Sequence, residues 1–141
     1  MPPSGDDPRR ADGSGETLAV VAESLYLANL LLLPGVCFLI LLRLYFKHRE
    51  DAPLLARNHL EQTLFASLWA GVLLVAVNLG IILLGGYRGP DTWLIVILYF
   101  TICHSSLILL GMLGLAKALA GRCFRYPLIG RRLPPGCRGA T

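Results

Sequence analysis

The chain has 141 residues, of which 55% are hydrophobic and 16% charged, with a net charge of +4 and a mean hydropathy of +0.60. A water-soluble domain of this size needs more polar residues to cover its surface, so the composition excludes an ordinary soluble protein. The apolar residues form blocks of about twenty, the length of a helix that crosses a ~30 Å hydrocarbon layer. We therefore predict an all-α integral membrane protein with three transmembrane helices.

Residues 1–17 are acidic and rich in Pro, Gly and Ser. A signal peptide would begin with a short basic region, so this stretch predicts a disordered acidic tail. The membrane domain is predicted to occupy residues 18–133, and residues 134–141 to form a flexible basic tail.

The first span is predicted at residues 25–46. Pro34-Gly35 lies in its middle, and because proline removes a backbone donor, we expect a kink at Pro34. A broken or partly re-entrant first helix is the alternative.

The second span is predicted at residues 65–84, after an interfacial amphipathic stretch that starts near Pro53. The turn "GGYRGPD" separates it from the third span, predicted at residues 93–116.

The basic residues gather beside two of the membrane segments. The loop after the first span holds Arg43, Lys47, Arg49 and Arg57, and the C-terminal end holds Lys117, Arg122, Arg125, Arg131, Arg132 and Arg138. The positive-inside rule then predicts a cytoplasmic C-terminus, and three crossings put the N-terminus outside. We expect lipid headgroups, rather than nucleic acid, to bind Arg122, Arg125, Arg131 and Arg132.

Small and polar side chains predict which helix faces meet in the membrane. On the third span these residues are His104, Gly111, Gly114 and Ala118, and on the second they are Thr63, Ser67, Gly71 and Asn78. We expect the two faces to pack together as an antiparallel hairpin. Asn29 is predicted to lie at the depth of Asn78 and to bond with it.

His104 is an ionisable residue inside a predicted span, which is often a sign of function. Its neighbours include Ser105 and Ser106, so an imidazole bonded to a hydroxyl or carbonyl is the favoured interpretation. A bis-histidine haem site would need a second histidine at equal depth, whereas His48 and His59 lie at the cytoplasmic edge.

The four cysteines do not predict a disulfide framework or a metal site. Cys37 and Cys103 lie in apolar segments, where cysteine behaves as a small hydrophobe. Cys123 and Cys137 are expected to be thiols in a reducing compartment.

The sequence contains no phosphate-binding glycine loop and no nucleophile near a base. It therefore predicts a non-enzymatic accessory subunit without a cofactor, whose partners are the lipid bilayer and other membrane proteins. A homo-oligomer stays open. Haem-mediated electron transfer is one alternative function.

Two stretches, "ARNHLEQTLF" and "LAGRCFRYPLIGRRL", resemble elements of the Tic-twenty-like family of small polytopic membrane proteins. The matching residues are His59 and Gln62 in the first stretch, and Gly121, Arg125, Tyr126, Pro127 and Leu128 in the second. The resemblance implies a bacterial inner-membrane protein and, as an alternative function, a component of a translocation machinery. It also suggests that the helix bearing His59 and Gln62 docks on the segment around Arg125 and Tyr126.

Overall fold

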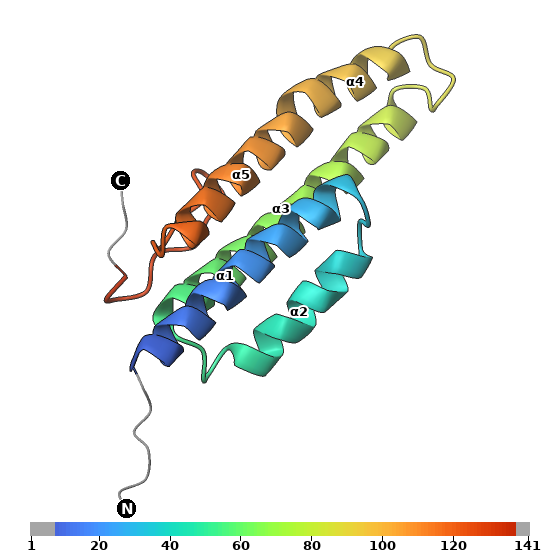
Figure 1. Cartoon of the computed structure of the whole chain (residues 1–141). Coiled ribbons are helices and arrows are strands. Elements are labelled where there is room, and N and C mark those ends of the chain that lie inside the picture. The colour runs from blue at the N-terminus through green and yellow to red at the C-terminus, as the bar shows by residue number, and fades with distance from the viewer. Residues whose placement is uncertain (1–7, 138–141) are drawn as a thin grey trace, which may run out of the picture.

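The computed structural model describes residues 8–137, and all regular elements in this range are helices (Figure 1). They are α1 (Pro8–Leu31), α2 (Val36–His48), α3 (Leu54–Leu83), α4 (Thr92–Leu98), a π-helical turn (Tyr99–His104) and α5 (Ser105–Leu119). The last three follow one another without a break and form one continuous rod. Of the predicted disordered tail, the described part is helical from Pro8, and the rest lies outside the described residues. The final residues 138–141 also lie outside them.

The first predicted span is not one kinked helix but two helices that run in opposite directions. The chain reverses between Leu31 and Val36, where Gly35 has a φ of 89°. That left-handed conformation suits glycine. The side-chain oxygen of Asn29 accepts a hydrogen bond from the Gly35 backbone N–H at 2.9 Å, which closes the turn. Proline and glycine here produce a reversal, so the expectation of a simple kink is wrong.

Asn29 therefore does not bond with Asn78, contrary to the prediction. The amide of Asn78 instead donates to the Leu74 carbonyl at 2.8 Å and accepts from the Tyr87 hydroxyl at 2.6 Å. These bonds tie the loop after α3 to the end of that helix.

Two helices are long and apolar enough to cross a membrane. Within residues 8–137 these are α3, with 30 residues, and the rod Thr92–Leu119, with 28 residues. At ~1.5 Å per residue, each exceeds a ~30 Å hydrocarbon layer. The described chain thus has two candidate spans rather than three. The predicted interfacial stretch is the first part of α3 itself, and it is packed into the bundle.

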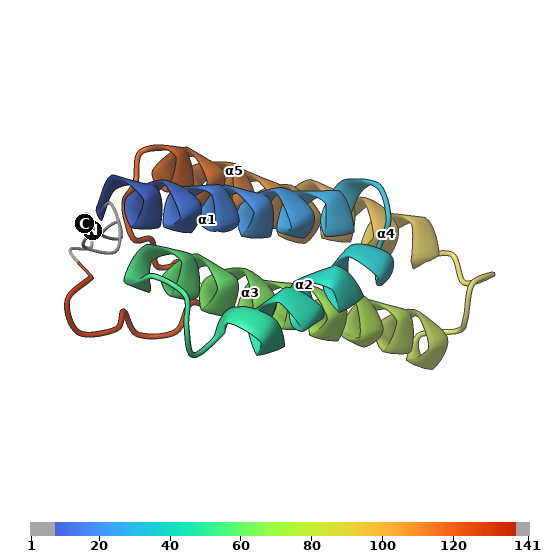
Figure 2. The same cartoon turned by 60° about the horizontal axis from the view of Figure 1, so that its bottom comes forward.

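Helix α1 occupies the centre of the bundle, with α3 and α5 on either side and α2 against α1 and α3 (Figure 2). The glycine face of α5 meets α1, and α3 and α4 contact each other toward the connecting loop. The start of α1, the end of α2, the start of α3 and the end of α5 all lie at one end (Figure 1). Because α1 and α2 form a hairpin, the predicted placement of the two termini on opposite sides does not follow from this fold.

Candidate functional site: a buried polar cluster

Three polar side chains from distant parts of the chain meet in the half of the bundle that holds the start of α3 and the end of α5. They are Glu23 of α1, His59 of α3 and Tyr126 of the segment after α5, and each is 0% exposed. His59 Nδ1 lies 2.6 Å from Glu23 Oε1, and the Tyr126 hydroxyl donates to Glu23 Oε2 at 2.6 Å. We call these three residues the buried polar cluster.

The contacts of His59 determine where the protons lie. Its Nε2 is 3.0 Å from the backbone carbonyl of Arg122, and because a carbonyl only accepts, Nε2 must carry a hydrogen. The Nδ1–Oε1 contact then holds one proton, which belongs either to a neutral acid or to an imidazolium. The pair is neutral overall in both cases, as a buried pair of this kind requires.

Burial shifts the ionisation of the acidic groups in the cluster. It raises the pKa of the Glu23 carboxyl, although the contacts with His59 and Tyr126 act in the opposite direction. Burial thus favours the neutral form of this carboxyl. Burial and the nearby Glu23 also raise the pKa of the Tyr126 hydroxyl, which stays a donor. All three groups are thus engaged with one another or with the backbone.

Glycines on α5 make room for the cluster. A Cβ added at Gly114 would lie 2.5 Å from Glu23 Oε2, and one at Gly111 would lie 2.7 Å from Cε1 of Tyr26. The Tyr26 hydroxyl donates to the carbonyl of Leu107 at 3.2 Å. Only hydrogen fits at these two positions, so the glycines allow α5 to approach the polar face of α1.

Two amide side chains of α3 extend the contact with the C-terminal segment, residues 120–137. Asn58 Oδ1 accepts from the Phe124 backbone N–H at 2.9 Å, and Gln62 Nε2 donates to the Arg131 carbonyl at 2.7 Å. Together with His59, they bond three backbone positions of this segment. The segment is therefore held against the first two turns of α3.

A disulfide joins Cys123 and Cys137, whose Cα atoms are 5.9 Å apart. It encloses most of the C-terminal segment in one loop, in place of the two separate thiols that were predicted. Cys37 and Cys103 are free. A bridge that closes a loop of this length contributes about 3 kcal/mol in the chain-entropy model.

We expect cysteine counting to detect this pairing. Protein purified without reductant, then denatured and alkylated, should carry label on Cys37 and Cys103 only, and reduction should add Cys123 and Cys137. Peptide mass spectrometry reads each position separately. Labelling of all four cysteines before reduction would contradict the pairing.

The structure brings some of the predicted site residues together. His59, Gln62 and Tyr126 lie at the contact between α3 and the C-terminal segment, while Arg125 and Pro127 beside them are exposed. The predicted lipid-binding arginines, Arg122, Arg125, Arg131 and Arg132, are all exposed on that segment.

Some of the predicted packing residues are buried between helices, and others are exposed or half-buried. Gly111, Gly114 and Ala118 are buried, and the first two face α1. Ser67 is buried, whereas Gly71 is exposed. His104 is half-buried, ends the π-helical turn and lies 5.1 Å from the ring of Phe100.

Residues 15–133 match the model of the magnetosome magnetite crystal formation protein family, MamF/MmsF. The chain belongs to this family. No curated protein and no solved structure matches it. The MamF/MmsF match corrects the Tic-twenty-like assignment, which is wrong. The residues behind that assignment, His59, Gln62 and Tyr126, pack a helix against a C-terminal segment, and such short spacings do not separate one helical membrane family from another.

Within this MamF/MmsF chain, sequence reasoning missed Glu23, the residue on which the cluster is centred. Its charge was counted with the acidic N-terminal region. The available signal was its position, because Glu23 stands alone in an apolar run that begins at Leu18. A lone acid in such a run needs a partner, and an unassigned histidine or tyrosine is the natural candidate.

The hydrogen bond of Gln62 can be tested by proteolysis. Gln62→Leu should cost about 1 kcal/mol and speed tryptic cleavage after Arg131 and Arg132, because the segment loses one of its anchors. Cleavage is measured after reduction, because the Cys123–Cys137 disulfide would otherwise keep the two cleaved pieces joined. Glu61→Gln is the matched control, because Glu61 pairs only with Arg57 on the surface among the contacts described. Equal cleavage rates in both variants would contradict the anchoring role.

Proposed function

We propose that this protein is a non-enzymatic membrane subunit of the magnetosome that acts in magnetite crystal formation. The family match over residues 15–133 and the two membrane-crossing helices support this role. The chemistry of the buried polar cluster supports it further. Its carboxyl, imidazole and hydroxyl bond one another and the backbone at 0% exposure, an arrangement suited to holding segments together.

The observation that carries the proposal is the anchoring of the C-terminal segment on α3. Three side chains, Asn58, His59 and Gln62, hold its backbone, and its arginine side chains stay exposed. The guanidinium group of Arg131 also stacks on the Phe65 ring of α3, 5.2 Å from its centroid. A rigid basic surface at the end of a membrane bundle suits anionic lipid headgroups and acidic faces of neighbouring membrane proteins. In this role the protein works by presenting that surface to an assembly.

The charge pattern supports a cytoplasmic position for this end of the bundle. Arg43, Lys47 and Arg49 lie at the same end as the C-terminal arginines, and the opposite loop carries Arg88 beside Asp91. Because the cytoplasm keeps thiols reduced, the Cys123–Cys137 disulfide would then form on oxidation outside the cell, as in purification without reductant. The three side chains of α3 would still hold the segment.

The test is gene replacement in cells that form magnetosomes. Arg125→Glu combined with Arg132→Glu should change magnetite crystal number or size without lowering the amount of protein in the membrane, because both side chains are exposed. Electron microscopy measures the crystals and immunoblotting measures the protein. Arg88→Glu, in the loop at the other end, is the control and should leave the crystals unchanged. Normal crystals in the double variant would overturn the proposal.

Neither alternative function gains support from the contacts described. Translocation rested only on the family resemblance that is now corrected. A haem site would pair His104 with a second histidine, but both ring nitrogens of His59 are engaged. His59 is also level with Gly114, ten residues from His104, or ~15 Å along the helix.

A further inference from the structure

The outer surface of the bundle changes from polar to apolar at one level. On α1 Glu16 and Ser24 are exposed, with Val21 between them at 40%, and the exposed residues are apolar from Leu31 onward. On α2 the exposed residues are apolar up to Ile40, and beyond it come the charged Arg43 and Lys47, with the exposed ring of Phe46 between them. Because α2 runs back alongside α1, Ser24 and Arg43 lie about equally far from the turn between the two helices.

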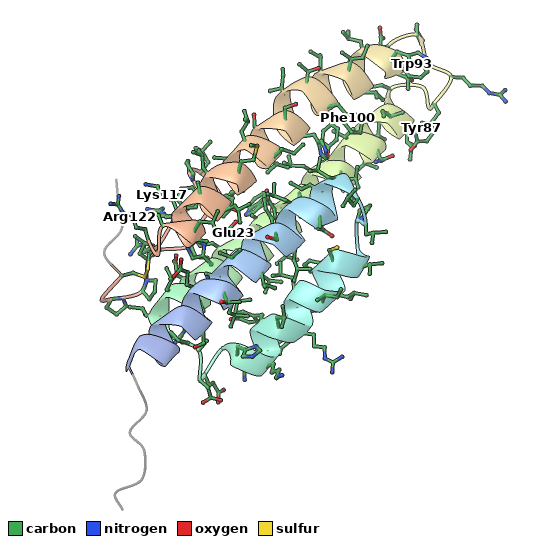
Figure 3. The ribbon with its side chains drawn as sticks, viewed as in Figure 1. Glu23, Tyr87, Trp93, Phe100, Lys117 and Arg122 are labelled. Carbon is green, nitrogen blue, oxygen red and sulfur yellow. A yellow bond between two sulfur atoms is a disulfide. The ribbon has the colours of Figure 1, made fainter. Side chains whose placement is uncertain are left out.

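The outer surfaces of α3 and α5 change from polar to apolar at the same height in the bundle. On α3 the surface pair Arg57–Glu61 is followed by exposed apolar residues from Leu68. On α5 Lys117 lies one turn beyond Gly114, which faces Glu23. We infer that the membrane boundary passes close to the buried polar cluster on all four helices. Figure 3 shows Glu23 of this cluster and, on α5, Lys117.

The α1–α2 hairpin ends about halfway across the bilayer. From Glu23 to Pro34 is eleven residues, or ~16 Å, whereas α3 continues from His59 to Leu83 for twenty-four residues, or ~36 Å. The turn is fully apolar on its outer side: Leu31, Leu32, Leu33 and Val36 are each more than half exposed. A hairpin that enters one face of a ~30 Å hydrocarbon layer and stops there is re-entrant.

The two leaflets then contain different amounts of protein. The leaflet next to the buried polar cluster holds α1, α2, the first half of α3, and α5. The other leaflet holds the second half of α3 and the rod formed by α4 and the π-helical turn (Figures 1 and 3). Packed helices lie about 8–10 Å apart. The protein therefore occupies about twice as much membrane area in the leaflet with four helices as in the leaflet with two.

We propose that this difference makes the chain a wedge that binds preferentially to curved bilayers, with the four-helix end in the convex leaflet. The convex leaflet of a bent membrane has more area at its surface than at its midplane. A hairpin that fills this leaflet and stops at the midplane occupies the surplus, as other one-leaflet insertions do. The partner is thus a bilayer of high curvature, a role beyond the proposed presentation of the basic segment.

In the leaflet away from the buried polar cluster, we expect lipid, rather than a second copy of the chain, to cover the exposed surface of α3 and α4. The exposed residues of α3 and α4 there are aliphatic, including Val75, Leu79, Leu94 and Ile97, each more than half exposed. Trp93, at the start of α4 and farthest from the buried polar cluster, is 74% exposed, as expected of an aromatic residue at a membrane interface.

The experiment measures how the full-length protein sorts among vesicles of different size. The purified, fluorescently labelled protein is reconstituted into neutral-lipid liposomes of mixed diameter, and its density per lipid area is read on single vesicles. Protease sensitivity of the C-terminal segment separates molecules with the four-helix end outward from those with it inward. Outward molecules should be severalfold denser on the smallest vesicles, and inward molecules should be depleted there.

A variant isolates the contribution of the hairpin. Pro34→Ala with Gly35→Ala favours a continuous helix in place of the turn, so the sorting by size should weaken. The wild-type comparison of the two orientations stands even if this variant does not fold. Equal density on all vesicle sizes, or the same enrichment in both orientations, would overturn the proposal. Efficient cross-linking of Val75→Cys between two copies would also overturn it. A second chain, rather than lipid, would then lie beside α3 in the leaflet that holds only two helices. Neutral lipid keeps this test independent of the basic surface, so either proposal can fail alone.

Discussion

Replacing Glu23 by leucine should lower the free energy of unfolding by about 3–5 kcal/mol, the largest effect expected of a single substitution in this chain. The change leaves His59 Nδ1 and the Tyr126 hydroxyl buried without the carboxyl that both contact. Buried polar groups that lose their partners retain the full cost of desolvation. Circular dichroism during titration of detergent micelles with sodium dodecyl sulfate measures the change.

The matched control is Glu23→Gln. The glutamine amide can donate to His59 Nδ1 while its oxygen accepts from Tyr126, and the Nε2 hydrogen of His59 still reaches the Arg122 carbonyl. We therefore expect Glu23→Gln to remain within about 1 kcal/mol of the original protein. Equal losses for leucine and glutamine would show that a charged carboxylate is essential. Equal stability of all three proteins would show that the cluster does not hold the fold together.

Gly114→Ala should also destabilise the protein strongly, by about 1–3 kcal/mol, through overpacking. The new methyl group would lie 2.5 Å from Glu23 Oε2, so either Glu23 leaves its partners or α5 moves away from α1. The same titration measures the loss. Because the clash involves the buried carboxyl, the effects of Gly114→Ala and Glu23→Leu should not add.

Gly71→Ala is the control for that substitution. Gly71 lies on α3, and a Cβ there meets nothing within 4 Å. Alanine is a better helix former than glycine, so a gain of about 0.5–1 kcal/mol is expected. A loss at Gly71 as large as that at Gly114 would mean that the helices pack differently from the arrangement described.

The crossing helices of the fold could be predicted from the sequence because they depend on a local property. Residues 65–84 and 93–116 are apolar over the thickness of a membrane. The first range ends one residue beyond the observed α3, and the second falls within the rod Thr92–Leu119. The first span could not be predicted in the same way. Its apolar run has the right length, but Pro34-Gly35 is compatible with both a kink and a reversal. The bond from Gly35 to Asn29 accompanies the reversal, and no local pattern distinguishes the two outcomes.

The candidate site was predictable only in part for a similar reason. His59, Gln62 and Tyr126 were singled out through the resemblance to the Tic-twenty-like family, which named the wrong family but pointed to residues that do lie together. Glu23 was missed because its partners are 36 and 103 residues away along the chain. The face of α5 that carries Gly111 and Gly114 was recognised as a packing face. Its partner proved to be α1, since the hairpin places that helix beside α5.

The side of the membrane on which α1 begins tests the central claim most directly. Single cysteines introduced by Glu16→Cys, Asp51→Cys and Arg88→Cys are labelled with a membrane-impermeant maleimide in intact and in opened cells, and mass spectrometry reads each introduced position. A re-entrant hairpin predicts that Glu16→Cys and Asp51→Cys react from the same side and Arg88→Cys from the opposite side. If Glu16→Cys instead reacts together with Arg88→Cys, α1 and α2 cross the membrane, and the fold described here does not exist in the bilayer.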